Sequence, residues 1–273
     1  MAIYGQPNSW TCGPFALKHA LLALGVFARE EDLSRLAGST EERGTDEGGL
    51  RRAAGAYRAK LVVIRKTEPT DARGELEAWL ARHVPVLLCV DQWEHWMTVV
   101  AADREHLVVF DSKYDAPLRA EPWELLMPRL ACRRPYLRGL WTRTVYDLHP
   151  IVPRARTGFR LSLDAGRTRH LLSESNATLA CHWDDYARAL LPLSLAPGDQ
   201  FEMGFDLARY IEQHRNQILD LTPPQAAPVV DGLAFVAGMY RAILRPEVEP
   251  YAVRQLAGIA TQLAAPPATV AAA

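Results

Sequence analysis

Four residues have the types and order needed for acyl-transfer chemistry: Gln6, Cys12, His95 and Asp111. Cys12 lies in the stretch QPNSWTCGPFALKHALLALG, directly before an apolar run that begins at Pro14. The first N–H groups of a helix have no intrahelical partner, and they can stabilise a thiolate or bind an oxyanion. The sequence therefore offers Cys12 as a nucleophile, while a small buried cysteine used only for packing is the alternative interpretation.

A cysteine nucleophile needs a base, and histidine titrates in the right range. His95 follows the polar loop DQWE and opens the apolar stretch HWMTVVAA. His83, His106 and His149 also lie near the ends of expected elements, so the pattern alone does not single out His95. Asp111 ends the next stretch, HLVVFD. It is placed to orient an imidazole, although an aspartate at a strand end also commonly begins a turn.

The spacing of apolar residues changes along the first part of the chain, and this spacing predicts the elements that must position the four candidates. Apolar residues at helical spacing predict helices at residues 14–24, at 29–38, after the stretch GTDEGG with Thr45 or Asp46 as N-cap, and at 71–83. Apolar runs predict strands at 60–64, 84–90, 95–102, 106–111 and 140–151, the third and fourth forming an antiparallel hairpin. Helices followed by strands predict an α+β fold in which N-terminal helices pack on an antiparallel sheet.

The stretch PIVPRART suggests a domain boundary, which divides the chain into residues 1–153 and 154–273. The second part is expected to be mostly helical, with helices at 167–191, 202–221, 226–244 and 250–264 separated by prolines. Its last residues, AAPPATVAAA, are expected to be a disordered tail. No motif in this part indicates a role. The adjacent Cys181 and His182 are poorly placed as a catalytic pair, because neighbours on a helix point about 100° apart.

Composition excludes several classes of protein. A net charge of −1 over 273 residues gives no electrostatic footprint for nucleic acid. We interpret the arginines from Arg129 to Arg138 as a solvated face, with a local basic patch as the alternative. The cysteines show no metal-ligand spacing, so neither a metal nor another cofactor is expected. Sparse cysteine, the lack of a signal peptide and the lack of an apolar run of ~20 residues predict a cytoplasmic protein without membrane segments. The cysteines are Cys12, Cys89, Cys132 and Cys181.

The order of these motifs resembles that of the papain-like cysteine peptidases, and in particular the bacterial peptidases that process bacteriocins at double-glycine leaders. The matching pieces lie within residues 1–150: the stretch around Cys12, the run REEDLSRLAG to KLVVI, and EHWMTVVAADREHLVVFDSKY. The resemblance implies Cys12 as nucleophile, His95 as general base and acid, Asp111 as the group that orients His95, and Gln6 as an oxyanion donor. Unlike the transporter-linked members, the chain shows no membrane span and no GxxxxGK[ST] motif.

Three functions are consistent with these residues. The first is a cysteine peptidase or amidohydrolase that forms an acyl-enzyme. The second is an amide-forming acyltransferase that uses the same triad, and the third is an inactive module that binds a peptide. The expected partner is a peptide, amide or thioester substrate, which a carrier or precursor peptide could present. Trp10, Trp93 and Trp96 are candidates for contacting it, with a core role open for the last two. The sequence does not indicate an oligomeric state.

Overall fold

The computed structural model describes residues 3–136, 141–154, 161–162, 168, 179, 182–195 and 205–265. The chain forms two compact units, residues 1–182 and 183–273. The domain boundary predicted after residue 153 falls in the first unit, close to a segment of which few residues are described. That boundary stays a prediction, and the C-terminal tail expected to be disordered lies outside the described residues.

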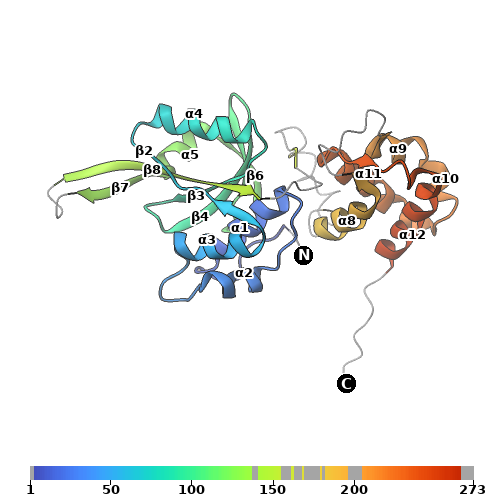
Figure 1. Cartoon of the computed structure of the whole chain (residues 1–273), viewed down its shortest axis with the longest axis horizontal. Coiled ribbons are helices and arrows are strands. Elements are labelled where there is room, and N and C mark those ends of the chain that lie inside the picture. Colours follow the sequence, from blue (N-terminus) through green and yellow to red (C-terminus); the bar gives the residue numbers. More distant parts are fainter. Residues whose placement is uncertain are drawn as a thin grey trace, which may run out of the picture. The chain divides into compact units, whose positions relative to one another are not determined.

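The first unit is built on an eight-stranded antiparallel sheet with the order β1-β8-β3-β4-β5-β6, in which β2 and β7 also pair with β8. The long strand β8 pairs in turn with β1, β3, β2 and β7, and its far end forms an arm with β7 (Figure 1). The strands are β1 (Ala59–Leu61), β2 (Ile64–Lys66), β3 (Val86–Val90), β4 (His95–Ala102), β5 (His106–Phe110), β6 (Leu118–Pro122), β7 (Ala131–Tyr136) and β8 (Trp141–Pro153).

Helices cover both faces of this sheet (Figure 1). Three N-terminal helices pack with Leu87, Cys89 and Trp96 in one apolar cluster, and two later helices pack with Leu88, Met97 and others in a second. The predicted α+β architecture, with N-terminal helices on an antiparallel sheet, is therefore confirmed. The helices are α1 (Cys12–Ala23), α2 (Glu30–Ala37) and α3 (Glu47–Ala56) on one face, and α4 (Pro69–Leu80) and α5 (Trp123–Leu130) on the other.

Helix α1 is central to the unit, and every one of its residues is buried. Its composition explains this, because apolar residues occur nearly all round the helix rather than on one stripe. The hydroxyl of Thr98 on β4 donates a 2.6 Å hydrogen bond to the carbonyl oxygen of Ala16, one turn after Cys12. Gly25 follows the helix with a φ of 72°, a left-handed conformation that favours glycine. The start of α1 is therefore fixed over the strand that begins at His95.

Elements β6, α5 and β7 were not predicted from the sequence. The residues of β6, LRAEP, are half polar, α5 contains Pro128, and β7 reads ACRRPY. Each sequence contradicts the local preference of its own element, so sheet pairing and packing must hold it. The predicted strand 60–64 is also divided into β1 and β2, with the N–H of Val62 donating to Pro150 between them.

The second unit is mostly helical, as predicted. Its helices are α8 (Trp183–Leu190), α9 (Leu207–Gln213), α10 (Arg215–Leu219), α11 (Ala227–Met239) and α12 (Ala252–Ala264), with short 3₁₀ turns at 191–193, 224–226 and 249–251. A three-stranded sheet joins β9 (Ser194–Leu195), β10 (Phe205–Asp206) and β11 (Ile243–Leu244). In the described part of the chain, no helix is both long and apolar enough to cross a bilayer.

Candidate active site

Cys12 is the first residue of α1, two residues before the predicted start of the helix at Pro14, and only 4% of it is exposed. The turn before it is held by Asn8, whose side-chain oxygen accepts hydrogen bonds from the N–H of Thr11 (3.1 Å) and from its hydroxyl (2.8 Å). Gly13 permits the close approach of the loop at Thr45, because a Cβ there would lie 2.7 Å from the Thr45 Cβ. The cysteine thus lies at a helix N-terminus whose approach is fixed on both sides.

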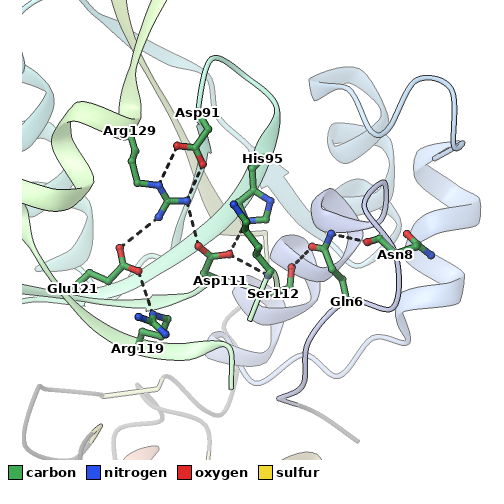
Figure 2. A network of polar contacts seen from close by, with 10 residues as sticks. Gln6, Asn8, Asp91, His95, Asp111, Ser112, Arg119, Glu121 and Arg129 are labelled. Atoms are coloured by element: carbon green, nitrogen blue, oxygen red, sulfur yellow. Dashed lines mark hydrogen bonds and ion pairs between the residues drawn. The ribbon is translucent and has the colours of Figure 1, made fainter. Parts of the chain in front are cut away.

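The β4–β5 hairpin brings His95 and Asp111 together. Thr98 pairs with Phe110, so continuing the register places Asp111 level with Met97, on the same face of the sheet as His95 two residues away. His95 Nε2–H donates to Asp111 Oδ1 over 2.6 Å (Figure 2). Asp111 has no exposed surface, and 8% of His95 is exposed. This diagonal cross-strand pair has the short distance of a charge-assisted hydrogen bond.

The protonation of the pair follows from these contacts. Burial alone would lower the pKa of His95, but hydrogen bonds with Asp111 and with Cys12 outweigh it and raise the pKa to about 9. Burial alone would raise the pKa of Asp111, yet the hydrogen bond and charge of His95, the Lys113 N–H and the Arg129 charge lower it. At neutral pH the pair is therefore an imidazolium next to a carboxylate. Nε2 is engaged by Asp111, so Nδ1 is the ring nitrogen that does not take part in that hydrogen bond.

Gln6 lies beside this pair and is oriented by two residues. Its Nε2 donates to the carbonyl oxygen of Asn8 (2.7 Å), and the hydroxyl of Ser112 donates to its Oε1 (2.7 Å; Figure 2). Its backbone N–H donates to Ser112 O over 2.8 Å. A carbonyl oxygen can only accept, so the contact with Asn8 defines which end of the amide is nitrogen. The second hydrogen on Nε2 remains available for a substrate oxygen.

The three candidate substrate-binding tryptophans occupy different places. Trp93 and Trp96 line a cavity of about 470 Å³, together with Thr45 and Cys89. The Trp96 indole N–H donates to Thr45 O (2.9 Å), and the Trp93 indole N–H donates to Asp147 (2.8 Å). Two of these lining residues connect the cavity to the site. Trp96 directly follows His95, and Thr45 packs against Gly13, which directly follows Cys12. Trp10 lies partly exposed in the turn before α1 and is not among the residues lining this cavity.

The other histidines near element ends lie in different surroundings. His106 is partly exposed beside Asp103, and His83 is exposed after α4. His149 is buried on β8, with Nε2 3.3 Å from Glu47 Oε2. Burial lowers the pKa of His149 more than its acidic neighbours raise it. Among the histidines that the structure describes, His95 is the one whose pKa is raised by both a buried aspartate and a cysteine.

Three residues around the site were missed from the sequence: Asn8, Ser112 and Arg129. Asn8 lies two residues after Gln6, and Ser112 directly follows Asp111. This proximity in the sequence could have identified both once Gln6 and Asp111 were candidates. Arg129 gave no such signal, and the interpretation of it as part of a solvated face is wrong. Only 23% of its side chain is exposed, and it pairs with Asp91, Asp111 and Glu121 (Figure 2). Arg133 and Arg134, by contrast, are exposed.

Two other thiols lie in the described part of the chain, Cys89 and Cys132, and both are buried. Burial is the main cause that raises the pKa of both Cys89 and Cys132, which keeps them protonated. Cys181 lies outside the described residues. Among the residues that the structure describes, no three His, Cys, Asp or Glu side chains are grouped to hold a metal ion.

The chain was compared with known proteins. No protein-family model matches it, and neither does any curated protein. Among solved structures it is similar to the peptidase domain of Streptococcus ComA, a bifunctional ABC transporter of a quorum-sensing pathway, at 15% identity and a TM-score of 0.43, covering 56% of this chain and 98% of that one.

Two further solved structures are similar over about half of this chain. One is a double-glycine-motif protease from an AMS/PCAT transporter in complex with a leader peptide, at 14% identity and a TM-score of 0.41, covering 55% of this chain and 90% of that one. The other is a putative C39-like peptidase from Bacillus anthracis, at 12% identity and a TM-score of 0.39, covering 54% of this chain and 92% of that one. These are peptidases of the kind that the sequence motifs resemble.

Proposed function

We propose that this protein is a papain-like cysteine peptidase or amidohydrolase that works through an acyl-enzyme on Cys12. One observation carries the proposal: His95 Nε2 lies 2.6 Å from the fully buried carboxylate of Asp111, and Cys12 is near enough to help raise the pKa of His95. An imidazolium held this way stabilises a thiolate, and a thiolate is the nucleophilic form of cysteine. A module that only binds peptides has no need for this combination.

The reaction begins when the Cys12 thiolate attacks the carbonyl carbon of an amide. The oxyanion that forms accepts hydrogen bonds from Gln6 Nε2 and from the backbone N–H of Cys12, at the N-terminus of α1. His95 gives its proton to the leaving amine as the C–N bond breaks, which leaves a thioester on Cys12. Neutral His95 then takes a proton from water, the hydroxide attacks the thioester carbonyl, and the acid departs as the thiolate re-forms. Asp111 stabilises the imidazolium in both steps.

The cavity lined by Trp93 and Trp96 is proposed to hold a side chain of the substrate. The two indoles stand among charged residues such as Arg43, Glu47 and Arg134, so the cavity offers both apolar and polar contacts to such a side chain. We also propose that residues 1–153 are the catalytic domain and residues 154–273 a separate helical domain. Cys12, Cys89 and Cys132 are free thiols, which supports a reducing compartment such as the cytoplasm.

A peptide-cleavage screen tests this function. The wild-type chain, Cys12→Ala and Cys132→Ala are each incubated with a diverse peptide mixture that includes a double-glycine leader peptide, and the products are identified by mass spectrometry. Cys132 is a matched control because it is buried and lies outside the proposed site. We expect cleavage by the wild type and Cys132→Ala and none by Cys12→Ala.

The same screen, repeated with added amines, separates the other candidates. Products that carry the amine instead of water-derived oxygen would identify an acyltransferase. Peptide capture without any new product would identify a binding module. Equal cleavage by Cys12→Ala would remove Cys12 from the mechanism.

A further inference from the structure

The turn between β3 and β4 has an unusual backbone. Three consecutive residues, none of them glycine, have positive φ angles: Asp91 at 55°, Gln92 at 62° and Trp93 at 69°. A left-handed conformation costs roughly 1–2 kcal/mol for each such residue. Contacts from outside the turn must therefore offset this cost. The position matters because His95 comes two residues after Trp93.

Each residue of the turn is fixed by a different partner. Asp91 forms a bidentate pair with Arg129, at 3.1 Å to Nε and 2.9 Å to Nη2, and its N–H donates to the Arg129 carbonyl oxygen at 2.8 Å. The Gln92 amide donates to Ala131 O (3.0 Å) and accepts from the N–H of Arg133 (2.9 Å). The end of α5 and the start of β7 thus provide most of what shapes the turn.

Arg129 also reaches the proposed site directly. The nitrogen that contacts Asp91 Oδ2, Nη2, lies 3.4 Å from Asp111 Oδ2, while Asp111 Oδ1 faces His95 (Figure 2). Nη1 lies 3.6 Å from Glu121. Burial alone would lower the pKa of Arg129, but hydrogen bonding to Asp91 and the nearby carboxylates raise it, so the guanidinium stays charged.

One guanidinium therefore connects the backbone that leads into His95 with the carboxylate that His95 contacts. We infer that Arg129 is a positioning residue that holds the His95–Asp111 pair in register by joining Asp111 to the Asp91–Trp93 turn. A lysine would keep the charge but could not make the forked contact, because an ammonium is a single point charge. The effect on turnover rests on the proposed function, whereas the positioning itself can be measured on His95.

The test compares Arg129→Lys with Arg119→Lys. Arg119 pairs with Glu121 and stacks on Tyr114, so it shares a partner with Arg129 and shows no contact with Asp91 or Asp111. The groups that act directly on His95 are Asp111 and Cys12. Histidine titration by NMR reports the His95 pKa. Because both variants keep the positive charge of the side chain, a change in the His95 pKa reports a change in geometry.

We expect Arg129→Lys to lower the His95 pKa by about one unit, since a loosened carboxylate stabilises the imidazolium less. Arg119→Lys should titrate as the wild type does. Unchanged titration in a folded Arg129→Lys protein would overturn the inference. If no peptide or amide is turned over but the pKa falls, the proposed function fails and the positioning role stands. If turnover is found and the pKa does not move, the reverse holds.

A second pair of variants keeps the inference testable if Arg129→Lys does not fold. Asparagine adopts the left-handed conformation readily, so Asp91→Asn should preserve the turn while weakening its link to Arg129. Glu121→Gln removes one negative charge from the other side of the same guanidinium without touching the turn. We expect Asp91→Asn to lower the His95 pKa more than Glu121→Gln does. Equal shifts would show a simple charge effect and would overturn the inference.

Discussion

His95 and His149 are two buried histidines of one sheet, each beside a carboxylate, and their protons behave in opposite ways. His95 Nε2 lies 2.6 Å from Asp111, and its pKa is raised to about 9. His149 Nε2 lies 3.3 Å from Glu47, and its pKa is lowered below the usual 6.5. A buried histidine beside a carboxylate is therefore charged in one region and neutral in the other.

The difference lies in how each carboxylate is engaged. Arg51 and Arg65 pair with the Glu47 carboxylate at 2.9 and 2.8 Å, closer than His149 does. Asp111 is fully buried and makes its shortest contact with His95, while Arg129 lies at 3.4 Å. A carboxylate already neutralised by two arginines offers little to an imidazole, and burial then favours the neutral form. A buried histidine–carboxylate pair thus indicates a proton-transfer site only when the carboxylate mainly serves the histidine.

Exchanging each histidine for glutamine gives the largest contrast. His95→Gln should lower kcat by about 10³-fold or more, because it removes both general-base and general-acid catalysis. His149→Gln should leave turnover within a few-fold of wild type. Steady-state kinetics on a peptide found in the screen above provides the measurement. A larger loss in His149→Gln than in His95→Gln would reverse the assignment.

Exchanging each carboxylate for its amide sharpens the comparison. Asp111→Asn should bring the His95 pKa down toward 6.5 and lower kcat by about 10²-fold, since the imidazolium loses its stabilising charge. Glu47→Gln should leave His149 neutral near pH 7, because burial is the main cause of its low pKa. NMR titration of both rings in each variant checks this. If the His95 pKa stayed raised in Asp111→Asn, Asp111 would not be the group that stabilises the imidazolium.

The pH dependence of stability should show both histidines with opposite signs. The pKa of His95 is raised to about 9 on folding, so it stabilises the fold below pH 6.5 and loses that contribution as the pH rises to 9. The shift corresponds to about 3 kcal/mol at 1.36 kcal/mol per unit. His149, with a lowered pKa, contributes above pH 6.5 and loses its contribution as the pH falls.

Denaturant unfolding at several pH values measures these contributions. His95→Gln should flatten the decrease between pH 6.5 and 9, and His149→Gln should flatten the decrease on the acidic side. If the stability of His95→Gln still decreased between pH 6.5 and 9 as in the wild type, the raised pKa of His95 would not contribute to folding stability.

The agreement between sequence and structure is best where one apolar pattern decides an element. The pattern of β4 places its start at His95, and the start of α1 lies two residues before the predicted position, at Cys12. Asp46 serves as the N-cap of α3, one of the two residues expected there. Helix α5 was missed because Pro128 and Arg129 interrupt its apolar pattern. The contact of Arg129 with Asp91, 38 residues away, depends on tertiary packing that no local pattern encodes.

The smallest expected effect concerns Ser112, which has no counterpart around His149. Ser112→Ala removes the hydroxyl that donates to Gln6 Oε1 and should lower kcat a few-fold by loosening an oxyanion donor. The His95 titration should not change. Ser39→Ala is a matched control, because that hydroxyl bonds to Thr45 instead. A shifted His95 pKa in Ser112→Ala would show that Ser112 acts through Asp111 rather than through Gln6.

The central claim is that His95 makes Cys12 a nucleophile, and the rate of Cys12 alkylation by iodoacetamide at pH 6.5 tests it without knowledge of the substrate. Peptide mapping separates Cys12 from Cys89 and Cys132, which are buried and protonated. The account predicts that Cys12 reacts at least 10-fold faster than either of these thiols, a roughly estimated lower bound for an activated thiolate, and that His95→Gln abolishes the advantage while His149→Gln keeps it. A Cys12 that reacts equally in wild type and His95→Gln would contradict it.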